Sequence, residues 1–462
     1  MVANTPNLQK VSITQVIENI ANKKFVANLL IMGFLLSIIE AIDVAALAYV
    51  APVLMKQWVI PAKVFGAVFG AGTFGLMVGG FIFGFLGDRI GRKKTLMIGI
   101  VWFSIFTLSC VWANSVHVLF YLRFLACVGL GGTVPLTIVL VNEYAPSRLR
   151  GRWVAGMFMG FSGGQGVGGI LAAWLIPTFG WQSTFILGGT VPLLILIAIY
   201  FRVPESVKYL VVKNRDRDEV VRLVRLLQPG IAVGPDTVFF AEGGEMKEVI
   251  FTPKVLFAGV LAIATPLIWV FYILNSSTVY FFNSWLPQLQ VASGFSVSHA
   301  SLLTSVYQFS GMVCTLAVGW LFDKRGMLAL VILPLFACLS VAVLGYPKSV
   351  VFMVINILFA GFFVVGTQAI LTITTPIWYP TGYRSSANGL AMGLAKIGSI
   401  SGPIIGGVLI SANLPLKNLY LLNSIVLGIA VFIVLILALL YQRHYPQSTP
   451  VGKTIEQMNL PD

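Results

Sequence analysis

The feature that most constrains this chain is its succession of apolar stretches, each about as long as a bilayer is thick. A hydrocarbon core of about 30 Å is crossed by roughly 20 helical residues, and lipid offers no hydrogen-bond partner to exposed backbone groups. With 58% hydrophobic and 10% charged residues, the chain also lacks the polar surface of a soluble fold. We therefore predict an all-α membrane protein with twelve transmembrane helices, near residues 28–50, 63–86, 95–113, 116–140, 152–175, 183–201, 255–282, 299–321, 327–346, 349–372, 387–411 and 419–441.

The basic residues are distributed by side of the membrane. A formal charge of +14 would suit a nucleic-acid partner, but the Lys and Arg residues gather in alternate loops. The loops on the other side hold only Lys56, Lys63, Lys348 and Lys417. By the positive-inside rule we predict a multi-pass protein of the cell inner membrane (plasma membrane) with both termini cytoplasmic, and no nucleic-acid partner. The segment before the first apolar stretch shows no signal-peptide pattern, so the first helix is expected to remain as an anchor.

Cysteines and glycines are interpreted as packing residues. Cys110, Cys127, Cys314 and Cys338 stand singly in apolar segments, without the spacing of a metal site or a disulfide framework. The glycine run 163–169 lacks the Lys-Ser/Thr ending and the preceding strand of a phosphate-binding loop, which favours close helix contact. No nucleophile triad is visible either. We expect no metal, no cofactor and no enzymatic activity.

A long polar segment, 202–254, divides the chain. It carries the charged run 213–219, which no membrane core would accept. We therefore predict an N-terminal six-helix bundle over 1–201, a cytoplasmic linker over 202–254, and a C-terminal six-helix bundle with a short cytoplasmic tail over 255–462.

The two halves share short motifs. Residues 84–89 are similar to residues 319–324 at an offset of 235, and Gly164 recurs as Gly398 at an offset of 234. Two parallel pseudo-repeats are typical of a transporter whose halves rock against each other around a central site.

The loop after the second apolar stretch reads Gly84-x-x-x-Asp88-Arg89-x-Gly91-Arg92, which resembles the cytoplasmic loop signature of the major facilitator superfamily. The resemblance covers nearly the whole chain and implies the major facilitator fold. The glycines let helix ends approach, and Asp88 can pair with a neighbouring helix to close one state of a transport cycle. The alternative is a charge cluster that only sets topology. The resemblance implies a gating role for Gly84, Asp88, Arg89, Gly91, Arg92, Asp323 and Arg384.

Further motifs resemble the aromatic acid/proton symporter family: Glu40-Ala41-Ile42-Asp43, Arg123 with Gly129-x-Gly131-Gly132, Pro204-Glu205-Ser206, and Gly398-x-x-x-Gly402-Pro403. The resemblance implies a proton-coupled secondary transporter that imports a small organic anion, an aromatic or related carboxylic acid. The chain departs from the family pattern where Glu40 replaces an aspartate, Ala41 a glycine and Lys396 an arginine. Nicotinate, sialate and dicarboxylates stay open as alternative substrates.

Ionisable residues within apolar stretches are functional candidates because their burial is costly. Glu40 and Asp43 are three positions apart, so they share a helix face with β-carbons about 5–6 Å apart. Two such carboxylates resist being ionised together, which suits a proton carrier. Arg123 cannot lose its proton and needs a partner. We predict that Glu40, Asp43 and Arg123 couple protons; the alternative is that one carboxylate only pairs with Arg123 to hold two helices together.

The second half supplies the candidate substrate site. Lys396 is the predicted anchor for a substrate carboxylate, with snorkelling toward an interface as the alternative. The seventh stretch adds a polar and aromatic face, although aromatic rings are also common at membrane interfaces and amides commonly bond between helices. The predicted substrate-binding residues are Lys396, Tyr280, Asn283, Ser284, Trp285, Tyr307, Gln308 and Gln368.

The rival function is a proton-coupled drug or metabolite efflux antiporter of the same fold. Such exporters usually carry a Gly-Pro motif in their fifth helix, whereas here it lies in the eleventh, at Gly402-Pro403, which favours uptake. A sensor on a carrier fold would need an added signalling domain. We expect the lipid bilayer, a small organic acid and protons as partners, and a protein that functions as a monomer.

Overall fold

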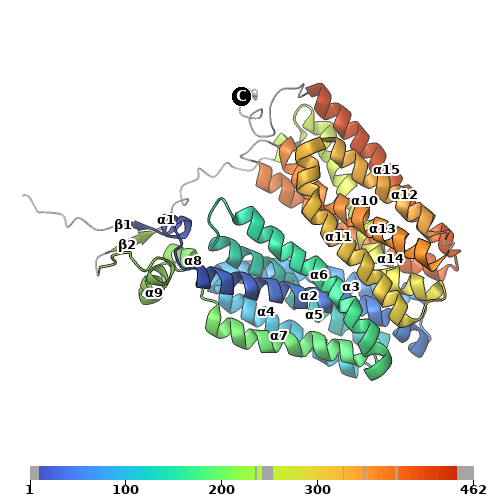
Figure 1. Cartoon of the computed structure of the whole chain (residues 1–462), viewed down its shortest axis with the longest axis horizontal. Coiled ribbons are helices and arrows are strands. Elements are labelled where there is room, and N and C mark those ends of the chain that lie inside the picture. The colour runs from blue at the N-terminus through green and yellow to red at the C-terminus, as the bar shows by residue number, and fades with distance from the viewer. Residues whose placement is uncertain are drawn as a thin grey trace, which may run out of the picture.

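The computed structural model describes residues 10–234, 237–241, 253–325, 327–346, 349–379 and 383–444. Two bundles of long helices lie at an angle to each other (Figure 1). The first bundle contains α2 (Lys23–Trp58), α3 (Ala62–Ile90), α4 (Arg92–Ser109) with the 3-10 turn η1 (Cys110–Trp112), α5 (Val116–Glu143), α6 (Arg150–Phe179) and α7 (Gln182–Arg202). The second contains α10 (Leu261–Ala292), α11 (Val297–Arg325), α12 (Met327–Leu344), α13 (Val350–Thr374) with η3 (Thr375–Trp378), α14 (Arg384–Ser411) and α15 (Leu416–His444).

These helices are long and apolar, as predicted. In the described part of the chain, ten are long and apolar enough to cross a membrane. Of the other two, α12 contains a shorter apolar helix, Leu330–Leu344, and α6 is long but rich in glycines, which lower its mean hydropathy. The twelve predicted stretches are therefore all found as helices. The seventh begins at Leu261 rather than at residue 255, because Pro253–Phe257 forms a separate 3-10 turn, η2.

The internal repeat is also a repeat of helix packing. A β-carbon on Gly164 of α6 would lie 2.4 Å from the carbonyl oxygen of Ile38 on α2. A β-carbon on Gly398 of α14 would lie 2.0 Å from the carbonyl oxygen of Ile273 on α10. Ile38 and Ile273 are related by the same offset as the repeated loop motifs. The repeated glycines therefore let α6 approach α2 as α14 approaches α10.

Gly398→Ala is expected to destabilise the protein, because its methyl group would meet a backbone carbonyl that only a shift of the whole helix can move. Overpacking of this kind costs about 1–3 kcal/mol, which should appear as a lower melting temperature of the purified protein in detergent. Gly393→Ala in the same helix is the matched control, since no heavy atom lies within 4 Å of its built β-carbon. Equal melting temperatures for the two variants would contradict this account of the contact.

The predicted linker is more than a connector. It contains α8 (Val207–Val212), α9 (Arg217–Leu227) and the strand β2 (Val238–Phe240), which pairs in parallel with β1 (Lys10–Ser12) ahead of α1 (Ile13–Glu18). Apolar residues of α1, α8 and α9 share one core with the adjacent end of the first bundle. We call this the linker end. The sequence did not predict the two strands, because each is short and its partner lies beyond the whole first bundle in the chain.

Glu18 ties this N-terminal segment to the loop between α5 and α6. Its carboxylate accepts hydrogen bonds from the backbone N–H of Ser147 (2.9 Å) and from the Ser147 hydroxyl. These bonds lower the pKa of Glu18, because they favour the ionised form. The contact is thus fully formed at neutral pH and weakens in acid, as Glu18 becomes protonated.

The two bundles touch at the end away from the linker. There a β-carbon on Gly66 of α3 would lie 2.9 Å from the carbonyl oxygen of Pro403 on α14, and the Ser298 hydroxyl of α11 donates to the carbonyl of Ala173 on α6 (2.9 Å). Toward the linker end of α3 and α14, a β-carbon added to Gly84 or to Gly389 would have no heavy atom within 4 Å. The contacts between the halves therefore concentrate at one end of the molecule.

Candidate functional site

Asp43 and Arg123 form an ion pair inside the first bundle. Both Asp43 carboxylate oxygens accept from Arg123 Nη1 at 3.2 Å, and Arg123 Nη2 donates to the Asp43 carbonyl at 3.1 Å. The side chains are 0% and 1% exposed. α7 closes over the pair at Gly188, where a β-carbon would lie 2.9 Å from Asp43 Oδ1. Asp43 thus has its counter-charge within the bundle, which is the pairing the sequence left open as an alternative.

Glu40 lies one helical turn away in a different situation. The residue is 0% exposed, and neither carboxylate oxygen has a hydrogen-bond partner of good geometry among the described residues. The nearby Thr133 hydroxyl on α5 donates to the Leu130 carbonyl (3.0 Å). An ionised carboxylate without a partner is costly to bury. Glu40, rather than Asp43, is therefore the carboxylate whose charge nothing in the described structure balances.

Lys396 lies in the middle of α14. It is half-buried and forms no ion pair or hydrogen bond with any residue in the described parts of the chain. Its depth follows from its neighbour Gly398, whose built β-carbon meets the backbone of Ile273 and Ser277 on α10. Lys396 thus lies near the level of Asn275, well away from either helix end.

Two side-chain amide pairs lie in the second bundle. Gln368 Oε1 on α13 accepts from Asn275 Nδ2 (2.6 Å) and from the Ser276 hydroxyl (3.5 Å) on α10. Gln308 Nε2 on α11 donates to Asn283 Oδ1 (3.1 Å). Each predicted amide therefore bonds to a neighbouring helix, and each pair has further donors or acceptors without a partner among the described residues.

The repeat relates the first of these pairs to Glu40. The offset of 235 that relates the loop motifs also takes Glu40 to Asn275 and Thr133 to Gln368. The polar contact between α10 and α13 thus occupies the position of Glu40 and Thr133 between α2 and α5. The sequence analysis missed Thr133 and did not select Asn275 for the site, although the repeat offset would have identified both.

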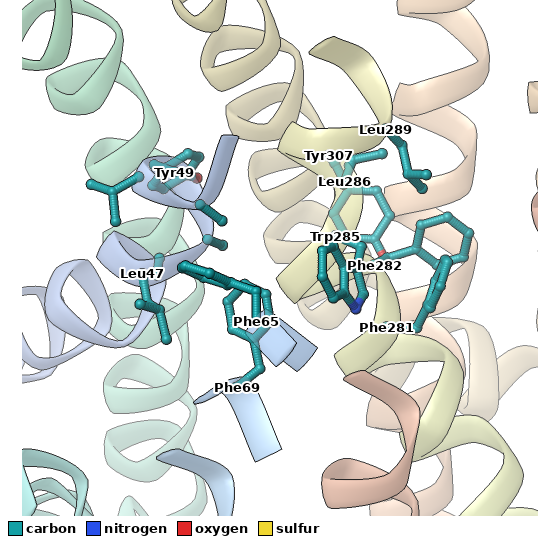
Figure 2. Close-up of a cluster of buried hydrophobic side chains, with 14 of the residues drawn as sticks. Leu47, Tyr49, Phe65, Phe69, Phe281, Phe282, Trp285, Leu286, Leu289 and Tyr307 are labelled. Carbon is teal, nitrogen blue, oxygen red and sulfur yellow. The ribbon is translucent and has the colours of Figure 1, made fainter. Parts of the chain in front are cut away.

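The predicted aromatic residues lie closer to the contact between the halves. Figure 2 shows Phe65 and Phe69 of α3 near Trp285 of α10, and the Phe69 and Trp285 rings are 5.2 Å apart, edge to face. The Trp285 indole N–H donates to the Pro403 carbonyl (2.8 Å), which leaves no donor for a ligand. Tyr307 is also fully buried, and its hydroxyl has no partner among the described residues. Two further predicted substrate-binding residues lie on α10: Tyr280 is half-buried and Ser284 is buried.

The loop motif forms a compact ionic cluster at the linker end. Arg92 pairs with Asp88 (3.0 Å) and with Glu143 at the end of α5 (3.2 Å), and it donates to the Gly87 carbonyl (3.0 Å). Glu205 accepts from the backbone N–H groups of Arg92 (2.8 Å) and Lys93 at the start of α4. A carboxylate is favourable at this position because the helix N-terminus carries partial positive charge.

The other predicted gating residues form fewer side-chain interactions with described residues. Gly91 adopts φ +109°, which suits glycine, and Glu205 lies close against it. The Arg89 carbonyl accepts from the Tyr209 hydroxyl of α8 (2.8 Å). Arg384 forms no ion pair with a described residue, and the Asp323 side chain lies outside the described part of the structure. Their gating role stays a prediction.

Sequence comparison decides the family. The Major Facilitator Superfamily profile matches residues 33–376 and 268–458. The chain belongs to the major facilitator superfamily. The profile matches across both bundles, so this member has the two six-helix pseudo-repeats that its loop motif implied, and it is a transporter rather than an enzyme.

Its relatives include proteins named as transporters of aromatic acids. The gallate transporter of Pseudomonas putida is 31% identical over 398 residues, covering 85% of this chain and 88% of that protein. The 4-hydroxybenzoate transporter PcaK of Pseudomonas aeruginosa is 33% identical, covering 83% and 86%. The benzoate transport protein of Acinetobacter baylyi is 29% identical, covering 97% of each. These similarities confirm the resemblance to the aromatic acid/proton symporter family.

Solved structures agree on the fold. A bacterial homologue of the human lysosomal transporter Spinster, in an inward-facing and occupied conformation, superposes with a TM-score of 0.71 at 14% identity, covering 93% of this chain and 99% of that one. A D-xylose-proton symporter gives 0.68 at 16% identity, covering 88% and 97%. At these identities the likeness concerns the fold alone.

Proposed function

We propose that this transporter imports an aromatic carboxylic acid together with protons by alternating access. The relatives named for gallate, 4-hydroxybenzoate and benzoate support the substrate class. The basic loops favour an inner-membrane location with the linker and both termini in the cytoplasm. The bundles over 1–201 and 255–462 are the moving bodies, joined by the linker 202–254, and a single chain suffices for the cycle.

The observation that carries the proposal is the ammonium of Lys396, which lies at mid-depth in the second bundle and has no partner among the described residues. A cation at this depth without a counter-charge is costly, and an arriving carboxylate would supply that charge. Gln368 lies at a similar level, and its Oε1 is already occupied by Asn275 and Ser276. Only its Nε2 donors are left for a ligand, and donors suit a carboxylate.

Glu40 supplies the proton site in this proposal. Asp43 is balanced by Arg123, whereas Glu40 has no counter-charge among the described residues. A proton on Glu40 removes the cost of moving it through the cycle, and its release on the linker side restores the ionised form. The Asp43–Arg123 pair then serves coupling indirectly, by holding α2 against α5 so that Glu40 keeps its position.

The contacts between the halves indicate which way this conformation faces. They concentrate at the end away from the linker, around Gly66, Pro403 and Ser298, which corresponds to a state closed on that side. In the proposed cycle these contacts separate while the linker ends of α3 and α14 meet. The ionic cluster of Asp88 and Arg92 lies at the linker end and would regulate that closure.

Lys396→Ala is expected to weaken binding of the acid roughly ten- to a hundredfold, because a charge-assisted hydrogen bond to a carboxylate contributes about 1.5–3 kcal/mol. The affinity for an uncharged amide analogue should change much less. Lys396→Arg keeps the charge and is expected to retain most of the affinity. The measurement is binding to the purified protein by calorimetry, with acid and amide compared for each variant. An equal loss for acid and amide would show that Lys396 is structural.

A transport assay tests the function as a whole. Purified protein in proteoliposomes with an imposed pH gradient is offered benzoate, 4-hydroxybenzoate, nicotinate, sialate and a dicarboxylate. We expect uptake of the aromatic monocarboxylates, dependent on the gradient. Uptake that requires the reverse gradient would instead indicate the efflux antiporter.

A further inference from the structure

A buried hydroxyl group lies beside the Glu40 carboxyl in the first bundle. Thr133 of α5 is 0% exposed, and its hydroxyl is close enough to interact with the Glu40 side chain. In this conformation the Thr133 O–H donates instead to the carbonyl of Leu130 on its own helix, at 3.0 Å. Neither Glu40 oxygen has a hydrogen-bond partner of good geometry among the described residues. Thr133 therefore offers Glu40 a hydrogen-bonding group that is directed elsewhere.

The packing of α4 fixes the orientation of the Thr133 side chain. A β-carbon added to Gly99 of α4 would lie 2.7 Å from Thr133 Cγ2, so the methyl group of Thr133 faces α4 at close range. With the methyl group held there, the hydroxyl oxygen keeps its place near both the Leu130 carbonyl and Glu40. Only the O–H bond can still turn, and this rotation needs no movement of the backbone.

The second bundle has a polar contact at the equivalent place. The repeat offset takes Glu40 to Asn275 and Thr133 to Gln368, and these two amides share a hydrogen bond of 2.6 Å. Amides do not gain or lose protons near neutral pH, so that contact does not respond to protonation. In the first bundle the same place holds an acid and a hydroxyl, whose hydrogen bonding must change when the acid gains or loses a proton.

A hydroxyl group can serve both charge states of a neighbouring carboxyl. When Glu40 is protonated, its O–H can donate to Thr133 Oγ1 while Thr133 keeps its bond to Leu130. When Glu40 is ionised, the Thr133 O–H can turn to the carboxylate. The Leu130 carbonyl lies inside α5 and still accepts its α-helical bond from the backbone N–H of Val134, so it stays satisfied.

The charged groups around Glu40 leave this role to Thr133. Asp43 and Arg123 lie close by, and they pair with each other. The other acidic and basic residues of α2 and of the helices packed against it, α3, α5, α6, α7, α10 and α11, lie in the first or last turn of those helices. Cys127 of α5 faces α3, against Gly72 and Gly75.

We propose that Thr133 sets how tightly Glu40 holds its proton, by accepting from the protonated acid and donating to the ionised carboxylate. This inference rests on the proposed function, in which Glu40 carries the proton, and adds the residue that allows the proton to leave. The proton passes from the Glu40 carboxyl to water on the linker side, and the Thr133 O–H stabilises the carboxylate that remains. Without this donor the ionised form is less favourable, so Glu40 holds its proton too tightly.

The test measures how uptake of labelled benzoate and 4-hydroxybenzoate into proteoliposomes depends on external pH. Thr133→Val keeps nearly the same shape but cannot donate a hydrogen bond. The pH at which uptake falls to half its maximum should rise by about one to two units, the worth of a hydrogen bond to a charged group. The maximal rate of net uptake should fall several-fold, because proton release becomes slow. Counterflow needs no proton release and should stay within a few-fold of wild type.

Two variants control for packing. Thr133→Ser keeps the hydroxyl group and should retain the pH dependence of the wild type. Thr137→Val removes another buried hydroxyl of α5, one turn away, which donates to the Thr133 carbonyl at 2.9 Å. Its pH dependence should also be that of the wild type. Thr133→Ala removes the same hydroxyl as Thr133→Val and replaces that variant if it does not fold.

An unchanged pH dependence in Thr133→Val, or in Thr133→Ala in its place, would overturn the proposal. An equal shift in Thr133→Ser or Thr137→Val would overturn it too, because the Thr133 hydroxyl would not be its cause. If neither Thr133→Val nor Thr133→Ala folds or exchanges substrate, Thr133 serves the structure and the proposal fails. Normal gradient-driven accumulation by Glu40→Gln would instead refute the proton site of the proposed function.

Discussion

Glu40→Gln is expected to abolish accumulation of the acid driven by a pH gradient while leaving substrate counterflow largely intact. Glutamine keeps the size of the side chain but cannot release or bind a proton. The variant therefore resembles the protonated carrier, which can still alternate between its two conformations with substrate bound. Gradient-driven accumulation should fall by at least about tenfold, whereas exchange of labelled for unlabelled acid in the absence of a gradient should stay within a few-fold of wild type.

The measurement uses the same proteoliposomes for both assays. Glu219→Gln is the control. Glu219 lies on α9 at the linker end, outside the bundles, and its carboxylate pairs with the Arg222 guanidinium at 2.6 Å. That variant should accumulate the acid normally. Wild-type accumulation by Glu40→Gln would exclude Glu40 as the proton site, and loss of both accumulation and counterflow would mean that Glu40 serves the structure or the substrate instead.

Asp43→Asn is expected to lower the stability of the protein strongly. The substitution leaves the buried Arg123 guanidinium without its counter-charge, and breaking a buried pair on one side costs about 3–5 kcal/mol. Arg123→Met should have a similar effect, since it leaves the Asp43 carboxylate buried and unpaired. The double variant Asp43→Leu/Arg123→Met removes both charges and should recover most of the lost melting temperature, because apolar replacements of a buried pair are often neutral.

Thermal unfolding of the four proteins in one detergent measures this coupling as a double-mutant cycle. Additive losses, with the double variant least stable, would show that the ion pair does not hold α2 against α5. Transport by the double variant is a separate readout. Proton-coupled uptake by a stable double variant would support Glu40 as the proton carrier, and its complete absence would assign coupling to the pair.

Several residues of the site could be predicted from the sequence, because they are recognised by composition or by the short spacing between neighbouring residues. Glu40, Asp43, Arg123 and Lys396 stand out because ionisable residues are rare in apolar stretches. Pairing of Arg123 with a carboxylate of α2 followed from its need for a counter-charge. The sequence did not predict which of the two carboxylates pairs with Arg123. Glu40 and Asp43 share a helix face, and they differ only in which residues of α5 and α7 contact them.

The amides show the same limit. Gln308 and Gln368 were recognisable as polar residues in apolar helices, but their partners Asn283 and Asn275 lie 25 and 93 residues away in the chain. Trp285 looked suited to a substrate ring, yet its N–H is taken by a carbonyl of another helix 118 residues away. Contacts of this range depend on how α10, α11, α13 and α14 are packed, which no local pattern specifies.

The sequence by itself determined that this chain crosses a membrane, how often it does so, and that its halves repeat, because lipid imposes helix length and the repeat preserves spacing. Only the tertiary structure decided that Asp43 pairs with Arg123 while Glu40 has no counter-charge among the described residues, and that the linker builds a small sheet with the N-terminal segment. Side-chain charge can be balanced by any residue that folding brings near, so its balance is a property of three-dimensional proximity and not of order along the chain.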